Sequence, residues 1–168
     1  MADVWLILGG ARSGKTRRGL SLADCSPSPV YIATAESRDA EMGMRIARHR
    51  EERGSQWHTI EAPLDLCSAL TGAASQGGAV LVDCLTLWLS NLMEAGLSPD
   101  DETERLVESL KPLSSTIIFV SNEVGLGIVP DNGLARSFRD AQGRLNQRMA
   151  AVADHVEFVA AGLPLTLK

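Results

Sequence analysis

The clearest chemical signal in the chain is a glycine-rich loop near its start. In VWLILGGARSGKT an apolar run is followed by the pattern G-x-x-x-x-G-K-T, which begins at Gly9 and ends at Thr16. Glycines let such a loop curl so that successive backbone N–H groups point at phosphate oxygens. A helix that begins near Lys15 adds the positive end of its dipole. We therefore predict a nucleotide site at residues 9–16, where Lys15 reaches the β- and γ-phosphates and Thr16 ligates Mg²⁺.

A carboxylate that could share the metal follows a second apolar run. AVLVDC (79–84) places Asp83 directly after four apolar residues. Such a strand-terminal aspartate often holds the magnesium of a nucleotide, in many cases through a water molecule. An acidic residue at the end of a buried strand is also common in proteins without any nucleotide. The combination with the glycine-rich loop is what favours a metal role for Asp83.

A histidine lies in an unusually basic segment, RIARHREER (45–53), which holds four arginines and two glutamates. On a helix over 40–53, the residues Arg45, His49 and Arg53 share one face. The nearby guanidinium charges disfavour the imidazolium form, so a neutral His49 keeps a nucleophilic lone pair. Attack on the α-phosphate of a nucleoside triphosphate would expel pyrophosphate and leave a nucleotidyl-histidine. The alternative is a solvated helix, laced with ion pairs, in which His49 has no chemical role.

The other histidines and the cysteines give weaker signals. His58 is the rival nucleophile, but it lies in a predicted strand with fewer charges, and we interpret His155 as structural. Cys25, Cys67 and Cys84 are odd in number and have no C-x-x-C spacing. We interpret them as reduced, mostly buried thiols of a cytosolic protein.

The elements that must position these groups alternate along the chain. Strands that are apolar on both faces and alternate with helices indicate a mainly parallel α/β sheet with helices on both faces. Pro164 favours an edge position, and an antiparallel direction, for the last strand. In such sheets ligands bind beyond the carboxyl ends of the strands. The predicted strands are 4–8, 29–34, 57–62, 79–84, 115–122, 155–162 and 163–168, and the predicted helices are 15–24, 40–53, 64–75, 86–94, 100–110 and 135–153.

Composition limits the class of protein. A length of 168 residues fits one domain over 1–168, and 45% apolar with 22% charged residues is ordinary for a soluble globular protein. The net charge of −5 and an aromatic content of 4% argue against nucleic acid as a partner. The first apolar run is too short for a membrane span or a signal peptide, so we expect a cytoplasmic protein.

From about residue 4 onward, the order of several segments resembles one family, the bifunctional adenosylcobinamide kinase / adenosylcobinamide-phosphate guanylyltransferases of cobalamin biosynthesis. The glycine-rich loop alone is unspecific, whereas R-I-x-x-H-R together with N-E-V-G-x-G-I-V-P is highly specific. The matching segments are GGARSGKT, YIATAE, EMGMRIARHREER, HTIEAP, VLVDCLTLWLSNLM, NEVGLGIVP and LARSFRDAQGRLNQRMA.

The resemblance implies two reactions. In the first, ATP or GTP phosphorylates the aminopropanol hydroxyl of adenosylcobinamide. In the second, GMP passes from GTP to that phosphate, which gives adenosylcobinamide-GDP and pyrophosphate. It also implies a RecA-like P-loop fold, Mg²⁺ as cofactor, and a homo-oligomer, for which a trimer is one candidate.

The resemblance also assigns residues. The guanylylated histidine falls on His49, and Lys15 joins it as the second catalytic residue, while the metal ligands fall on Thr16 and Asp83. The nucleotide contacts fall on Gly9, Gly10, Ala11, Arg12, Ser13, Gly14, Lys15, Thr16, Ala33, Thr34, Ala35, Arg50, Glu51, Glu52, Arg53, Glu61 and Asp83.

Two other functions fit part of the pattern. One is a monofunctional small-molecule kinase that uses the same loop and forms no covalent intermediate. The other is a nucleotide-switched module that acts on DNA or on a protein, although neither a basic stripe nor an aromatic platform supports it. The loop SNEVGLGIVPDN (121–132) either positions the corrinoid or serves as a tight connection, and the residues alone leave both open.

Overall fold

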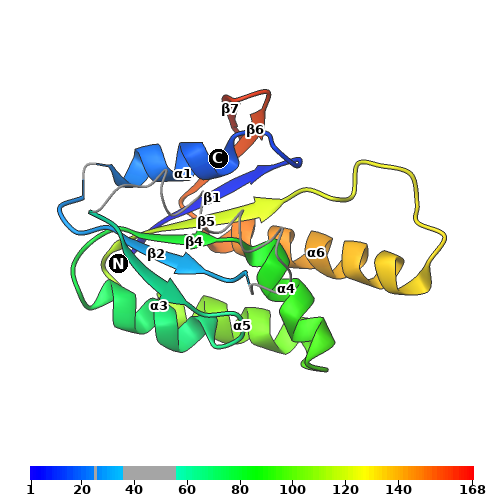
Figure 1. The fold of residues 1–168 in the computed structure, drawn as a ribbon, viewed down its shortest axis with the longest axis horizontal. Helices are drawn as coiled ribbons and strands as arrows, with labels where there is room; N and C mark the ends of the chain where they lie inside the picture. Colours follow the sequence, from blue (N-terminus) through cyan, green and yellow to red (C-terminus); the bar gives the residue numbers. More distant parts are fainter. Residues whose placement is uncertain (25, 36–55) are drawn as a thin grey trace.

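The computed structural model describes residues 1–24, 26–35 and 56–168. These residues form one seven-stranded sheet with helices packed on its two faces (Figure 1). The strands are β1 (Asp3–Gly9), β2 (Val30–Ala33), β3 (His58–Glu61), β4 (Val80–Asp83), β5 (Thr116–Asn122), β6 (His155–Ala160) and β7 (Leu163–Thr166). The helices are α1 (Lys15–Ala23), α3 (Leu66–Ala74), α4 (Leu85–Glu94), α5 (Pro99–Leu110) and α6 (Gly133–Val152).

The strand order is β3-β2-β4-β5-β1-β6-β7, so β5 lies between the strand that enters the glycine-rich loop and the strand that ends at Asp83. All pairings are parallel except the last, in which β7 runs antiparallel to β6 at the edge. The predicted parallel sheet with an antiparallel edge near the C-terminus is therefore confirmed. Pro164 lies in that edge strand, where its missing N–H breaks no ladder inside the sheet.

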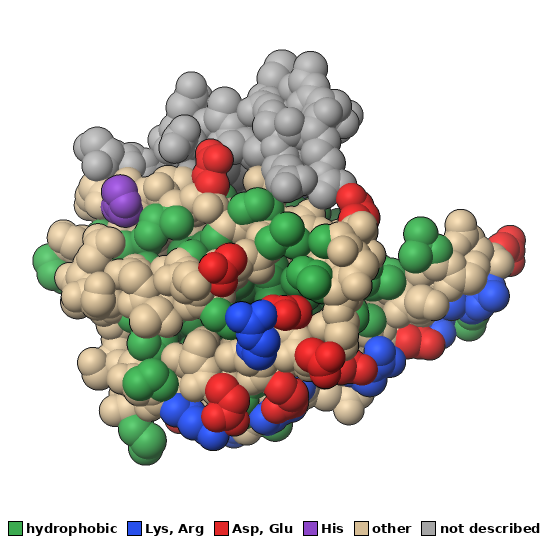
Figure 2. All heavy atoms as spheres, turned by 90° about the horizontal axis from the view of Figure 1, so that it is seen from below, with side chains coloured by type: hydrophobic (Ala, Val, Ile, Leu, Met, Phe, Trp, Pro, Cys, Tyr) green, Lys and Arg blue, Asp and Glu red, His purple; other side chains and the backbone are tan. Residues whose placement is uncertain are grey.

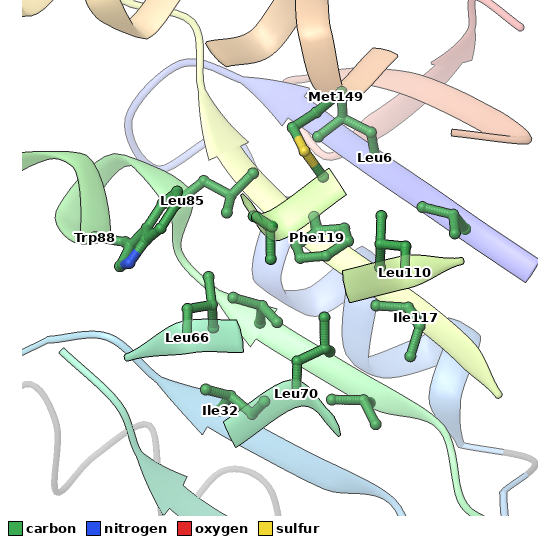
Figure 3. Close-up of a cluster of buried hydrophobic side chains, with 14 of the residues drawn as sticks. Leu6, Ile32, Leu66, Leu70, Leu85, Trp88, Leu110, Ile117, Phe119 and Met149 are labelled. Atoms are coloured by element: carbon green, nitrogen blue, oxygen red, sulfur yellow. The ribbon is translucent and has the colours of Figure 1, made fainter. Parts of the chain in front are cut away.

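Two apolar layers hold the helices against the sheet. Alternate residues of the central strands face α3, α4, α5 and α6 on one side, and the intervening residues face α1 on the other. Figure 3 shows the larger layer, in which Phe119 lies at the centre with Leu6, Leu85 and Met149 around it. Trp88 is fully buried there, and its indole Nε1 donates to the carbonyl of Leu64 at 2.9 Å. This core fixes the strand ends that carry the candidate site.

Local capping explains where the helices begin. The Asn132 side chain accepts from the Ala135 N–H, so α6 begins at Gly133, two residues before the predicted start. Asp65 caps α3 through the Ser68 N–H. Ser98 and Pro99 form the start of α5, with the Ser98 hydroxyl accepting from the Asp101 N–H. The predicted helix over 40–53 lies outside the described residues.

The outer face of α5 and α6 carries charges of both signs (Figure 2). Arg144 pairs with Asp100 at 3.1 Å and Arg148 pairs with Glu104 at 2.6 Å, so the two helices are linked by ion pairs. Acidic and basic side chains alternate on this surface and partly neutralise one another. Among the described helices, none has the length and apolar character that crossing a membrane would need.

Candidate nucleotide and metal site

The glycine-rich loop joins the carboxyl end of β1 to the first turn of α1. Gly14 has a φ of 100°, in the left-handed region that glycine adopts without strain, and it directly precedes Lys15. A Cβ built at Gly9 would lie 2.4 Å from the Val159 carbonyl oxygen of β6, so a larger residue does not fit there. Both glycines of the motif are thus required by the backbone itself.

Lys15 lies largely buried at the base of this loop. Its Nζ donates to the Gly10 carbonyl, and the Ser13 hydroxyl lies 3.5 Å away. Burial lowers the pKa of Lys15, while the electrostatic influence of Cys84 and Asp83 acts in the opposite direction. The ammonium group therefore lies against the loop itself, where a bound phosphate would need a cation.

Asp83 receives two hydroxyl hydrogen bonds at the carboxyl end of β4. Thr16 Oγ1 donates to Asp83 Oδ2 at 2.9 Å, which connects the start of α1 to the second predicted metal ligand. The phenol of Tyr31 donates to the same Oδ2 at 2.8 Å. The two residues predicted to serve Mg²⁺ are thus brought into contact, although 67 positions separate them.

Three of the predicted nucleotide contacts form one row across the sheet. Ala33 of β2 pairs with Glu61 of β3 on one side and with Asp83 of β4 on the other. Paired residues of parallel strands point to the same face, so Glu61 and Asp83 extend on the side of α1. These residues therefore lie with the phosphate loop at the carboxyl edge of the sheet, which is where ligands bind in folds of this kind.

Thr34, another predicted nucleotide contact, follows β2 directly and joins two strand ends. It is fully buried, and its hydroxyl donates to the Cys84 carbonyl at 2.7 Å and accepts from the Cys84 N–H at 2.8 Å. Asn91 of α4 donates to the carbonyls of Thr34 and Pro63. The Thr34 hydroxyl thus joins the ends of β2 and β4, and Asn91 adds the end of β3.

The turn between β6 and β7 contacts the phosphate loop from the other side. Ala161 and Gly162 both have positive φ, of 51° and 80°, which makes a tight reversal. The Gly162 N–H donates to the Ser13 carbonyl at 2.8 Å. This contact supports the loop at a point that no local sequence pattern indicates.

The histidines separate into two groups. His49 and the predicted contacts Arg50, Glu51, Glu52 and Arg53 lie outside the described residues. His58 begins β3 and His155 begins β6, so both lie at the amino ends of parallel strands, opposite the phosphate loop. The His155 ring stacks on Trp5 at 4.0 Å, and its Nε2 lies 3.2 Å from the Asp3 carboxylate. The structural interpretation of His155 agrees with these contacts.

Sequence reasoning missed Tyr31, Asn91 and Gly162. Tyr31 is the single tyrosine of the chain, in an otherwise apolar strand. A buried phenol generally finds a partner for its hydroxyl, and this was the one signal that pointed to it. Asn91 and Gly162 contact the site through residues far away in sequence, so their roles depend on the assembled fold.

Residues 5–167 match the model of a family described as cobinamide kinase / cobinamide phosphate guanyltransferase. The chain belongs to this family. The bifunctional adenosylcobalamin biosynthesis protein CobP of Pseudomonas aeruginosa is 50% identical over 166 residues, which cover 97% of this chain and 96% of that protein. The bifunctional adenosylcobalamin biosynthesis protein CobU of Salmonella typhimurium is 38% identical over 178 residues, which cover 97% and 98%.

Solved structures with much lower identity share the fold. An ATPase of a bacterial type III secretion system aligns with a TM-score of 0.58 at 14% identity and covers 98% of this chain and 56% of its own. The P4 protein of bacteriophage phi6, in complex with ADP, aligns with a TM-score of 0.53 at 15% identity and covers 96% and 52%. The expected RecA-like P-loop fold is confirmed. As a member of the cobinamide kinase family, the chain is a kinase and a guanylyltransferase.

Proposed function

We propose that this chain carries out both family reactions on adenosylcobinamide at the carboxyl edge of its sheet, with His49 as the covalent carrier of GMP. The observation that carries the proposal is the contact between Thr16 and Asp83 beside a complete phosphate loop. The roles of Lys15, Thr16 and Asp83 rest on that geometry, and the role of His49 rests on the family pattern in the sequence.

The kinase step needs a bound triphosphate and an oriented alcohol. Loop N–H groups of residues 9–16 and the Lys15 ammonium hold the β- and γ-phosphates. The aminopropanol oxygen of the corrinoid attacks the γ-phosphorus as the bond from that phosphorus to the β-phosphate oxygen breaks. The nucleoside diphosphate leaves, and the proton of the alcohol passes to solvent. Positioning and charge neutralisation supply most of the rate in such transfers. We propose both ATP and GTP as donors.

In the guanylyl step a nitrogen of neutral His49 attacks the α-phosphorus of GTP. The P–N bond forms as the bond to the β-phosphate oxygen breaks, and pyrophosphate leaves. A phosphate oxygen of cobinamide phosphate then attacks the same phosphorus, the P–N bond breaks, and His49 is regenerated. We propose Arg50, Glu51, Glu52 and Arg53, with Glu61 and with Ala33, Thr34 and Ala35, as further nucleotide contacts.

The residues present fit Mg²⁺. Thr16 and Asp83 offer hard oxygen atoms at the mouth of the loop, and their 2.9 Å contact suits a hydroxyl that ligates the ion while it donates to the carboxylate. Among residues 1–24, 26–35 and 56–168 there is no cluster of three or more His, Cys, Asp or Glu side chains that could hold a metal. Water and phosphate oxygens would therefore complete the shell, which is the arrangement Mg²⁺ prefers. The ion would neutralise charge on the phosphate oxygens.

We also propose that the chain works as one domain over 1–168, in the cytoplasm, as a homo-oligomer with a trimer as the first state to test. Its partners are the corrinoid and the two nucleotides, without nucleic acid. The mixed charges on the face of α5 and α6 support the absence of nucleic acid among the partners, because a surface that binds nucleic acid is normally basic.

The test uses GTP labelled at either the α- or the γ-phosphate. The protein is incubated with Mg²⁺ and each label and is then denatured. We expect α-label to stay on the protein, to survive alkali and to be lost in acid, as a phosphoramidate would. The His49→Ala variant should lose the label, while kinase activity on adenosylcobinamide should remain.

His58→Ala and His155→Ala are the matched controls, because the chain holds three histidines and these two lie at the opposite edge of the sheet. Both controls should keep the label at the wild-type level. Full labelling of His49→Ala would refute the covalent role of His49. Transfer of γ-label to an alcohol with no protein adduct would instead support a monofunctional kinase.

A further inference from the structure

Tyr31 has a polar contact that packing alone does not explain. It lies in β2, it is largely buried, and it packs in the layer between the sheet and α1. Phenylalanine would fill the same space without a hydroxyl to satisfy. The Tyr31 hydroxyl reaches past its own cross-strand partner, Leu81, and donates to Asp83 Oδ2 at 2.8 Å. The hydroxyl is thus directed at the carboxylate that we assign to Mg²⁺.

The two donors to Asp83 converge on one oxygen atom. Thr16 and Tyr31 both donate to Oδ2, from α1 and from β2, while among the described residues no donor reaches Oδ1. A carboxylate held on one oxygen from two directions cannot rotate without losing a charge-assisted hydrogen bond. Its second oxygen is then oriented in a constant direction, as a ligand to metal-bound water requires.

The phenol ring is itself held in place. The ring of Trp57 meets it edge-on, with ring centroids 6.2 Å apart and an interplanar angle of 83°. Edge-to-face pairs of this kind favour one relative orientation. Because this contact holds the ring in one orientation, the hydroxyl is already directed at Asp83 before any ligand binds.

We propose that Tyr31 is a positioning residue for Asp83 and that it sets the Mg²⁺ requirement of both reactions. This inference rests on the proposed role of Asp83 as a magnesium ligand. Tyr31 touches neither nucleotide nor metal in this mechanism and acts through the Asp83 carboxylate. Loss of its hydroxyl should therefore change the metal dependence far more than the rate at saturating metal.

The first experiment compares Mg²⁺ titrations of Tyr31→Phe and wild type in the kinase and guanylylation assays. Losing an outer contact to a metal ligand typically costs 10–100-fold in metal affinity, so we expect the Mg²⁺ concentration at half-maximal rate to rise about tenfold. The rate at saturating Mg²⁺ should fall much less. Thr103→Val is the matched control, because it removes another buried hydroxyl, bonded to the Pro99 carbonyl in α5. It should leave the Mg²⁺ requirement unchanged.

The second experiment follows binding without turnover. Because the chain has one tyrosine, protein labelled with 3-fluorotyrosine gives one ¹⁹F resonance, that of residue 31. With GDP present, addition of Mg²⁺ should shift this resonance in wild-type protein and leave it unshifted in Asp83→Asn. An unshifted wild-type resonance, or an equal shift in Asp83→Asn, would overturn the inference even if Tyr31→Phe failed to fold.

The two proposals fail in different ways. If Asp83→Asn keeps the wild-type Mg²⁺ requirement, the assignment of Asp83 as a metal ligand is wrong. If Asp83→Asn is impaired while Tyr31→Phe keeps the wild-type Mg²⁺ midpoint, only the role of Tyr31 is refuted.

Discussion

Replacing Thr34 by valine tests the polar contact that joins β2 to β4. The two side chains have nearly the same shape, so the variant removes a hydroxyl without opening a cavity. In the wild type this hydroxyl bonds both the N–H and the carbonyl of Cys84, inside a fully buried site. Thr34→Val should therefore leave the Cys84 N–H without its partner.

The expected loss of stability depends on which hydrogen bonds the N–H and the carbonyl of Cys84 keep in the variant. The Cys84 carbonyl still accepts from the Trp88 N–H at 3.2 Å, so it loses one of two partners. The Cys84 N–H loses the partner that the structure shows, and a buried donor left unsatisfied costs about 1–3 kcal/mol. Together we expect the free energy of unfolding to fall by about 3 kcal/mol. For a chain of this size that corresponds to a drop in Tm of roughly 6–12 °C.

The assay is thermal unfolding followed by circular dichroism, with Thr34→Ser as the matched control. Serine keeps the hydroxyl and loses a methyl group, so it should cost about 1 kcal/mol. Equal destabilisation by serine and valine would show that packing, not hydrogen bonding, accounts for the effect. A Tm for Thr34→Val within about 2 °C of wild type would also refute the reasoning, because that shift is under 1 kcal/mol.

Three further predictions concern the residues around the loop. Gly162→Ala should raise the KM for nucleotide several-fold in steady-state kinetics. Gly162 has a φ of 80°, and a Cβ there would lie 2.8 Å from an Arg17 nitrogen, so alanine should disturb the turn that is bonded to Ser13. An unchanged KM would argue against the support role of this turn. Lys15→Met should lower kcat at least about 100-fold and yet raise the Tm at neutral pH, because burial lowers the pKa of Lys15 and so disfavours its charged form in the folded state. By the same sign, wild-type stability should gain as pH rises toward 10.5, and Tm measured against pH should show this gain only in wild type. Burial raises the pKa of Cys84 to about 11, so at pH 8 roughly one thiol in a thousand is ionised. In a variant with both Cys25→Ser and Cys67→Ser, a thiol-specific disulfide reagent should therefore label Cys84 only as the protein unfolds.

Much of the fold could be predicted from the sequence because its periodicity is strong. Buried parallel strands such as β4 and β5 read as continuous apolar runs, and their predicted limits lie within one residue of those observed. The residues that we assign to phosphate and metal binding lie at the ends of such runs, as Gly9 and Asp83 do. The apolar runs therefore predict which residues lie at the carboxyl edge of the sheet, although they do not predict the order of the strands.

The contacts inside the site could not be predicted in the same way. The Tyr31–Asp83 bond spans 52 positions, and it forms because β2 and β4 are neighbours with Ala33 opposite Asp83. Strand order is set by the packing of the whole sheet, and one sequence does not reveal it. The hydrogen bonds of Thr34 to the backbone of Cys84 depend on the same strand order, so the family pattern at this position did not indicate them.

The support of Ser13 by Gly162 has a consequence for biogenesis. The ribosome makes the glycine-rich loop before the residue that supports it, because Gly162 lies almost 150 positions after Ser13. A nascent chain that has emerged only as far as β5 would hold the loop sequence without its brace. Affinity for nucleotide should thus appear only after Gly162 has been made, and products truncated before it should bind GTP weakly.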